Sequence, residues 1–148
     1  MSEEIANITY KKDRVLCLEG DENNDLYQVV AGRLIVFVLN GSQVNALAIL
    51  EKGDFFGELS FFDQRPRSAH VVALDDTTVT KYQTTSVREQ FPKWLMLLAQ
   101  SITNKIRRTD ELIAHHRIRR KKSTKSVALS MEEQTHLFQL IKKKAELA

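Results

Sequence analysis

Short apolar runs separated by glycines fill the first half of the chain. Four glycines stand between these runs at intervals of nine or twelve residues, at Gly20, Gly32, Gly41 and Gly53. The runs are rich in β-branched and aromatic residues, are too short for independent helices, and occupy residues 26–30, 34–39, 44–50, 70–74 and 78–82. Asn40-Gly41 suits the two central positions of a type I′ hairpin turn, which both require positive φ. The pattern predicts a barrel or sandwich of antiparallel strands across about residues 14–83.

The apolar period becomes helical after Tyr82. Ser86 and Glu89 have the spacing of a capping box, which predicts a helix start, and Pro92 suits the first turn of a second, longer helix. That longer helix carries a mostly apolar seam with four-three spacing. The seam consists of Leu95, Ala99, Ile102, Ile106, Thr109, Ile113 and His116. It predicts a parallel helix pair between two copies, and so a homodimer through residues 95–116; the alternative is a helix that lies on its own barrel.

A basic stretch and a third helix follow. Residues 117–126 hold six lysines and arginines, so the rest of the chain, whose total charge is +3, is net negative. This local charge supports an alternative function, in which the chain binds nucleic acid or an anionic surface through residues 117–126 and the barrel binds no nucleotide. Ser130 and Glu133 form another capping box at the start of an amphipathic helix. Its apolar residues are Met131, Leu137, Phe138, Leu140 and Ile141. That helix either packs on the barrel or engages a partner.

The composition fits one globular domain with an appendage. The chain has 148 residues, of which 43% are apolar and 28% are charged. No apolar run approaches the ~20 residues that a membrane-spanning helix needs. The first residues lack the apolar core of a secretory signal, so we expect a cytoplasmic protein.

The residue pattern gives little support to catalysis or metal binding. The single Cys17 has no partner at metal-ligand spacing and is expected to be a small buried residue of the first strand. His115 and His116 are adjacent, so on a helix they point about 100° apart, unlike a metal-binding i, i+4 pair. His70 and His136 stand alone and are expected on the surface. We therefore expect neither an enzyme nor a metal site.

The stretch FFGELSFFDQRPRSAHVV, residues 55–72, places charged residues among core-like phenylalanines. Burying a charge without a partner is costly, so this stretch predicts a binding site. Gly57 allows close backbone approach where a helical turn begins, and the free N–H groups of that turn suit an anion. Arg67, stiffened by Pro66, offers a planar charged fork to a phosphate, and Glu58 can accept from a sugar hydroxyl. These residues describe a site for a small nucleotide; the alternative is a Glu58–Arg67 salt bridge that closes the loop.

Two runs of the chain resemble the phosphate-binding cassette of the cyclic nucleotide-binding domain family: GDFFGEL at residues 53–59 and RSA at residues 67–69. The resemblance covers about residues 8–117. It implies a mainly β jelly roll followed by a long C-terminal dimer helix. Residues 118–129 are then a basic linker, and residues 130–148 form the short terminal helix.

The resemblance also implies roles for individual residues. Glu58 is similar to the glutamate that accepts from the ribose 2′-hydroxyl, and Arg67 is similar to the arginine that pairs with the cyclic phosphate. The other implied ligand-binding residues of the cassette are Gly57, Leu59, Ser68 and Ala69. An alternative is a domain that keeps the fold and binds no nucleotide.

The long helix resembles the dimer helix of bacterial cyclic AMP receptor proteins, in which a threonine and a neighbouring serine reach the adenine. Thr109 and Asp110 stand at that place, which makes them candidate ligand-binding residues; the alternative is that Thr109 fixes the register of the seam. Cyclic AMP is the expected ligand and cyclic GMP is the weaker candidate, with purine preference left open by Asp110. About thirty residues follow this helix, too few for the winged helix-turn-helix of the receptor proteins. Sequence-specific DNA binding is therefore not expected, and the implied partner is an unidentified protein effector.

Overall fold

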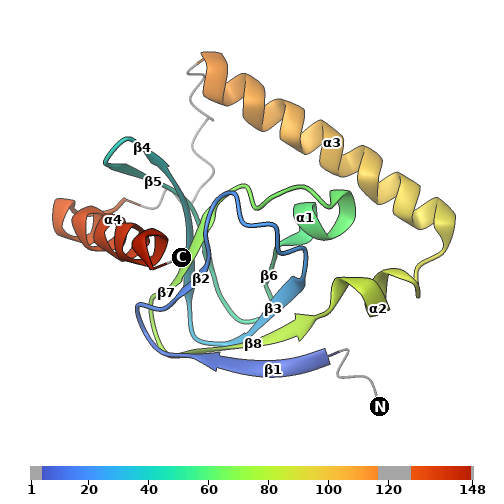
Figure 1. The fold of residues 1–148 in the computed structure, drawn as a ribbon, viewed down its shortest axis with the longest axis horizontal. Coiled ribbons are helices and arrows are strands. Elements are labelled where there is room, and N and C mark those ends of the chain that lie inside the picture. Colours follow the sequence, from blue (N-terminus) through green and yellow to red (C-terminus); the bar gives the residue numbers. More distant parts are fainter. Residues whose placement is uncertain (1–4, 117–127, 148) are drawn as a thin grey trace.

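The computed structural model describes residues 5–116 and 128–147, in which two four-stranded antiparallel sheets pack face to face with four helices outside them (Figure 1). One sheet has the order β1-β8-β3-β6, with strands at Ile5–Tyr10, Thr77–Tyr82, Leu26–Ala31 and Phe55–Phe56. The other has the order β2-β7-β4-β5, with strands at Val15–Cys17, His70–Ala73, Leu34–Asn40 and Gln43–Leu50. The predicted class, antiparallel β structure followed by a long and a short helix, is confirmed.

Two strands, β1 and β6, were not expected, and β2, which holds Cys17, was expected only as an unbounded first strand. β1 extends the β region back to Ile5, well before the predicted start at residue 14, and it pairs along its whole length with β8. Its residues alternate between exposed and half-buried because it lies at the edge of its sheet, so its periodicity is weak. β2 and β6 are three and two residues long, too short to give a periodic signal.

The hairpin between β4 and β5 differs by one residue from the predicted turn. Asn40 pairs with Gln43, which makes Gly41 and Ser42 the central residues. Gly41 has a φ of 64°, whereas positive φ outside glycine occurs within the described residues at Asp13 and Gln64 only. Glycine at the first central position with ordinary φ at the second is the requirement of a type II′ turn. The predicted type I′ turn at Asn40-Gly41 is therefore wrong.

The core has two parts, one on each side of the β2-β7-β4-β5 sheet. Between the two sheets lie Val29, Leu34, Ala73 and Val79, each at most 1% exposed. Cys17 belongs to this cluster, as expected for a small buried residue of a strand. On the other side, a second cluster is covered by α4 (Met131–Glu146). This sheet is therefore buried on both faces, which explains why every residue of β7 is buried.

α2 (Thr84–Arg88) begins before the predicted capping box. Its N-cap is Gln83, without a side-chain cap, and Ser86 lies inside the helix. Instead, Asp25 caps the helix from a distant loop: its Oδ1 accepts from the Thr84 N–H at 3.0 Å and from the Thr84 hydroxyl at 3.1 Å. The helix start predicted at Ser86 is wrong because a tertiary contact replaced the local one.

α3 (Lys93–His116) and α4 begin where the sequence indicated. The Pro92 carbonyl accepts from the N–H groups of Leu95 and Met96, so Pro92 immediately precedes α3. For α4 the predicted capping box is confirmed: the Glu133 N–H donates to Ser130 Oγ at 3.1 Å, and the Ser130 N–H donates to Glu133 Oε2 at 2.7 Å.

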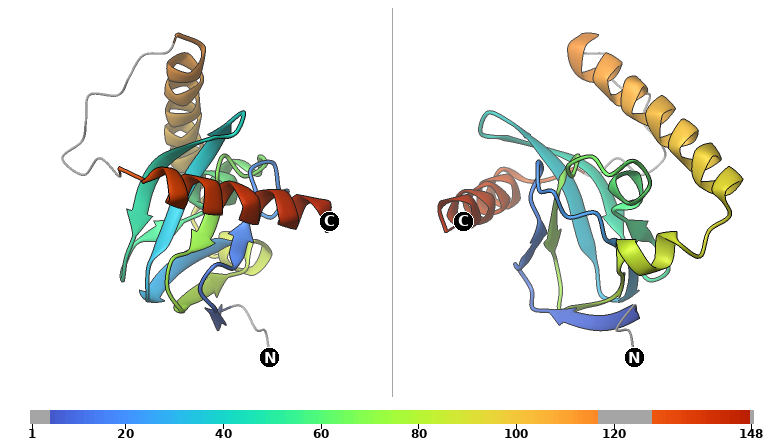
Figure 2. Two further views of the ribbon diagram at one scale, coloured as in Figure 1. Left: turned by 90° about the vertical axis from the view of Figure 1, so that its left-hand side faces the viewer. Right: turned by 45° about the vertical axis from the view of Figure 1, so that its right-hand side comes forward.

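α4 lies on the outer face of the β2-β7-β4-β5 sheet (Figure 2). Leu137 and Ile141 are 3% and 5% exposed, and His136 Nε2 lies 2.9 Å from Asp13 Oδ1. Of the two uses left open for this helix, the structure shows the first, packing on its own domain. The basic stretch at 117–126 lies outside the described residues.

Within the described parts of the chain, none of the helices is both long enough and apolar enough to cross a membrane.

Candidate functional site

A cavity of about 180 Å³ lies between the start of α1 (Glu58–Asp63) and the inner face of the β2-β7-β4-β5 sheet. All six cassette residues predicted as ligand-binding line it: Gly57, Glu58, Leu59, Arg67, Ser68 and Ala69. Its other wall is mostly apolar and consists of Cys17, Val36, Ala48, Leu50, Phe55, Phe56 and Val71, together with Ser60. A cavity with a charged end and an apolar wall suits a small ligand that carries one anionic group.

Arg67 is the buried charge of this cavity. Its side chain reaches Gly57, the residue before α1, and Arg67 is 4% exposed. Nη1 donates to the Gly57 carbonyl at 3.1 Å, while Nη2 donates to the Asp25 carbonyl at 2.5 Å and to Asn23 Oδ1 at 3.2 Å. All three acceptors are neutral, and among the described residues Nε is buried without a hydrogen-bond partner. Of the five N–H groups of the guanidinium, the Nε–H and one Nη1–H thus have no acceptor, and no carboxylate of the described residues is bonded to it, an arrangement suited to a phosphate oxygen.

Gly57 makes room for this arginine. Its φ is 84°, and a Cβ built on it would lie 2.2 Å from Arg67 Nη1 and 2.7 Å from the Asp25 carbonyl oxygen. The Gly57 carbonyl accepts from Arg67 and also from the Phe61 N–H at 2.9 Å, which starts α1. The first N–H groups of α1 have no intrahelical acceptor, and the residues that carry them, Glu58, Leu59 and Ser60, line the cavity. Glycine here therefore positions both the arginine and the helix start.

Glu58 is exposed, not buried, although its phenylalanine neighbours had indicated burial. It lies at the first position of α1 and lines the cavity. None of the ion pairs found within the described residues joins Glu58 to Arg67, so the alternative of a plain salt bridge closing the loop is not what the structure shows. The carboxylate oxygens of Glu58 are therefore accessible to a ligand that donates hydrogen bonds.

Asp25 was missed by sequence reasoning. Its carbonyl holds Arg67, its carboxylate caps α2 through Thr84, and its Oδ2 lies 3.2 Å from Lys81 Nζ. Burial opposes the charge on Asp25, but the bonds from Thr84 and Lys81 outweigh it and lower the pKa of the carboxyl. The run DENND at residues 21–25 signals a loop, yet no spacing in it indicates which of its oxygens would face the arginine.

Thr109 and Asp110 lie outside the cavity. Both are exposed on α3, and the Thr109 hydroxyl donates to the Lys105 carbonyl at 3.0 Å. The structure therefore brings together six of the eight predicted residues. The remaining two lie on a helix that contacts α1 and projects beyond the strands (Figures 1 and 2).

α3 has a covered face and an exposed apolar face. Thr103 is 3% exposed where the helix meets α1. A stripe with i, i+4 spacing remains open to solvent: Trp94 at 67%, Leu98 at 50%, Ile102 at 48% and Ile106 at 40% exposed. One side of α3 thus lies on its own domain, as in the alternative given for the seam, and the other side, with Ile102 and Ile106, is exposed. The helix pair between two copies stays a prediction.

Two buried titratable groups, Cys17 in the cavity wall and His70 next to Phe37, have shifted pKa values. Burial raises the pKa of the Cys17 thiol to about 11, although Arg67 acts in the opposite direction. His70 is buried at 7% exposure, against the expectation of a surface position, and its Nδ1 accepts from the Glu19 N–H at 3.0 Å. Burial lowers the pKa of His70, with Asp21 partly opposing. Among the described residues, no cluster of three or more histidine, cysteine or acidic side chains is placed to hold a metal.

Comparison with known proteins defines the family. The cyclic nucleotide-binding domain family matches residues 7–92, which is more than half of the chain. The chain therefore belongs to the cyclic nucleotide-binding domain family, and its two sheets form the jelly roll of that family. It contains a regulatory domain of the cyclic nucleotide-binding kind.

Particular relatives are regulators. A cyclic AMP receptor protein of Thermus thermophilus is 38% identical over 69 residues, which are 46% of this chain and 32% of that protein. A cAMP-dependent protein kinase regulatory subunit of Aspergillus niger is 31% identical over 81 residues, 55% of this chain and 19% of that protein. The chain thus spans no more than about a third of the length of either relative.

Two solved structures have a similar fold over about three quarters of this chain. The cAMP-bound form of the EAL enzyme Bd1971 is similar with a TM-score of 0.66 and 27% identity, over 75% of this chain and 30% of that one. The Thermus thermophilus catabolite activator protein is similar with a TM-score of 0.59 and 26% identity, over 77% of this chain and 54% of that one. In both cases the similarity covers only part of the larger protein.

Proposed function

We propose that the chain is a regulator that binds cyclic AMP in the cavity beside α1 and transmits binding through α3 to an effector protein. Cyclic GMP is the second candidate ligand. The observation that best supports this proposal is the state of Arg67. Its guanidinium is buried beside Gly57, at the start of α1, and its Nε–H has no hydrogen-bond acceptor among the described residues. The names of both sequence relatives, a cyclic AMP receptor protein and a cAMP-dependent kinase regulatory subunit, support the choice of cyclic AMP. The proposal is for a regulator and not for an enzyme.

The cavity offers a group for each part of such a ligand. Arg67 and the first N–H groups of α1 would hold the cyclic phosphate, the Glu58 carboxylate would accept from the ribose 2′-hydroxyl, and the Ser68 hydroxyl would add a donor. The apolar wall that includes Val36 and Val71 would contact the sugar and the purine.

The cavity is small for a nucleotide, which gives binding a structural consequence. Its volume of about 180 Å³ lies below the roughly 300–1,000 Å³ of most small-molecule sites. Nucleotide binding must therefore move the lining, and α1 is a lining element that is joined to β6 by Gly57 alone and to β7 by the irregular residues 64–69. We propose that α1 shifts as Arg67 exchanges part of its carbonyl contacts for phosphate oxygens.

The output passes through α3 in this proposal. The stripe formed by Trp94, Leu98, Ile102 and Ile106 is apolar and exposed, and a homodimer through residues 95–116 would cover it. Thr109 and Asp110 would approach the purine after a movement of α3, or would reach the cavity of the partner. On this division, residues 8–117 form the sensor, residues 118–129 a linker, and residues 130–148 a helix attached to the sensor.

Substitution of the buried arginine tests the assignment. Arg67→Leu should weaken cyclic AMP binding by about 1.5–3 kcal/mol, the scale of a hydrogen bond to a charged group. Arg33→Leu is the matched control because it removes an exposed arginine that pairs with Asp75 away from the cavity. Calorimetric titration of both folded variants decides the question: equal affinities in the two variants would reject Arg67 as the phosphate ligand.

A further inference from the structure

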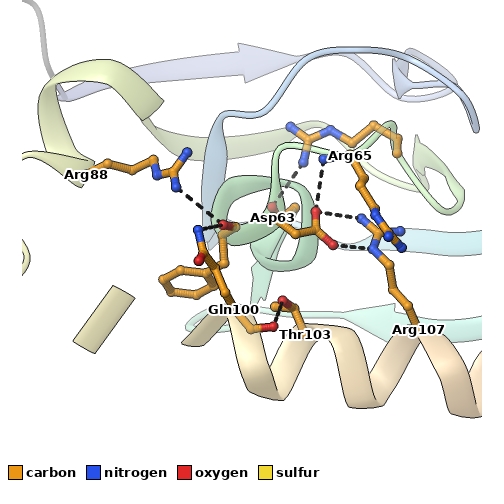
Figure 3. A network of polar contacts seen from close by, with 9 residues as sticks. Asp63, Arg65, Arg88, Gln100, Thr103 and Arg107 are labelled. Atoms are coloured by element: carbon orange, nitrogen blue, oxygen red, sulfur yellow. Dashed lines mark hydrogen bonds and ion pairs between the residues drawn. The ribbon is translucent and has the colours of Figure 1, made fainter. Parts of the chain in front are cut away.

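The last residue of α1 is joined to α3 by a buried ion pair. Asp63 binds Arg107 with both carboxylate oxygens: Oδ1 accepts from Nη2 at 3.0 Å, and Oδ2 accepts from Nε (Figure 3). The side chains of Asp63 and Arg107 are 6% and 12% exposed. A two-point pair of this kind fixes both the distance and the orientation of the groups it joins.

The neighbouring backbone carbonyl adds two further contacts. The Phe62 carbonyl accepts from Gln100 Nε2 on α3 at 3.3 Å and from Arg88 Nη2 on α2 at 3.4 Å (Figure 3). The Phe62 ring also contacts the ring of Phe91, which lies in the segment between α2 and α3; the two ring centroids are 6.5 Å apart. The end of α1 therefore contacts α2, α3 and the segment between them.

Asp63 is charged at neutral pH in this setting. Burial opposes its charge, but the bonds from Arg107 and from the Arg65 N–H outweigh that effect and lower the pKa of the carboxyl. Removing one partner of a buried pair leaves the other charge without compensation, so such pairs are hard to separate. The Asp63–Arg107 pair is thus a two-point polar contact between α1 and α3.

The two ends of α1 have different tasks. Its first turn lines the cavity, and its last residue, Asp63, carries the ion pair, five residues or about 7.5 Å further along the helix than Glu58. A helix this short moves as a rigid piece, so any shift of its first turn reaches Asp63. We infer that Asp63 and Arg107 are positioning residues that make α1 and α3 move together, so that filling of the cavity changes the position of α3. This inference rests on the proposed function and names the link through which that function would be transmitted.

Amide hydrogen exchange of α3, measured with and without saturating cyclic AMP, tests the link. In the wild type, cyclic AMP should change the exchange of peptides from residues 93–111 by at least about fivefold, the lower end of typical coupling between sites. Asp63→Asn keeps the shape and removes the charge; it should still bind cyclic AMP, with affinity within about threefold of wild type, and lose most of the α3 response. Asp63→Glu keeps the charge and should retain most of the response.

Two further variants separate a link from a purely structural role. Asp75→Asn makes the same chemical change in an exposed ion pair with Arg33 and should leave the α3 response unchanged. The double variant Asp63→Asn/Arg107→Met removes both charges and so leaves no unpaired buried charge. It allows the test even if Asp63→Asn alone does not fold. An α3 response equal to that of the wild type in folded Asp63→Asn or in the double variant would overturn the inference while leaving nucleotide binding intact. A wild type that binds no cyclic nucleotide would instead overturn the proposed function, and the inference with it.

Discussion

Gly57→Ala probes the contact between the helix start and the buried arginine. The backbone at Gly57 has a φ of 84°, so any side chain there costs about 1–2 kcal/mol of strain. The new Cβ would also lie 2.2 Å from Arg67 Nη1 and 2.7 Å from the Asp25 carbonyl oxygen, closer than atoms can approach. The guanidinium must move, and the loss of one charged hydrogen bond adds about 1.5–3 kcal/mol. We expect the free energy of unfolding to fall by about 2.5–5 kcal/mol in total.

Gly53→Ala supplies the control for backbone strain. Gly53 has a φ of 96°, and a Cβ there would meet no atom within 4 Å. This variant should lose only the strain of about 1–2 kcal/mol and should bind cyclic AMP like the wild type. Gly57→Ala should bind at least about tenfold more weakly, because its arginine is displaced from the cavity; a tenfold change corresponds to about 1.4 kcal/mol.

Urea denaturation and calorimetric titration of the two alanine variants give the comparison. Denaturation comes first, since it establishes that each variant is folded under the titration conditions. Equal unfolding free energies and equal affinities in Gly57→Ala and Gly53→Ala would show that the arginine does not depend on this glycine, and would refute the reasoning.

Three further predictions concern the core, the pH dependence of stability and the helix surface. Cys17 should react with a thiol reagent at pH 8 about 100-fold more slowly in the native protein than in denaturant, because burial raises its pKa to about 11; comparable rates would contradict its burial. His70 has its pKa lowered by burial, so its contribution to stability is complete above about pH 6.5 and is lost as the pH falls below that value. His70→Gln should therefore reduce the loss of stability between pH 7 and pH 5, and an unchanged pH profile in denaturant titrations would count against this. Ile106→Glu should raise the dissociation constant of the dimer at least about tenfold with little change in thermal stability, since the side chain is 40% exposed; sedimentation equilibrium that shows a monomeric wild type would reject the dimer.

The strands that bury one or two faces could be predicted from the sequence. β3, β4, β5, β7 and β8 lie within one residue of the predicted runs because their apolar residues point into the two core clusters. β1 could not, since an edge strand with half of its residues exposed carries little periodicity. The hairpin turn was displaced by one residue because Asn-Gly and Gly-Ser both satisfy a two-residue turn, and the bulge between Val36 and Phe37 changes the register that decides between them.

Helix starts divide according to where their caps come from. The α4 cap consists of Ser130 and Glu133, three residues apart, so a local rule finds it. The α2 cap comes from Asp25, 59 residues before Thr84, and no local spacing reveals it. A Ser86-Glu89 pair then gives a false signal, because the same residue types are common on helix surfaces.

The cassette residues of the site could be predicted, whereas their contacts could not. The sequence indicated that a buried Arg67 needs hydrogen-bond partners. Those partners include the carbonyls of Gly57 and Asp25, and because every residue has a carbonyl, the sequence cannot show which ones the arginine contacts. Glu58 was expected among buried phenylalanines, yet a helix start turns its side chain towards solvent. Thr109 and Asp110 depend on the placement of α3, which is fixed by tertiary contacts such as Asp63–Arg107.

The most direct test of the account is calorimetric titration of the purified chain with cyclic AMP, cyclic GMP and linear 5′-AMP. We expect cyclic AMP to bind with a dissociation constant of about 1 μM or lower, cyclic GMP to bind more weakly, and 5′-AMP to give little response. Absence of binding by both cyclic nucleotides to the folded protein would contradict it, and would leave Arg67 as a structural residue in a domain that keeps the fold without the ligand.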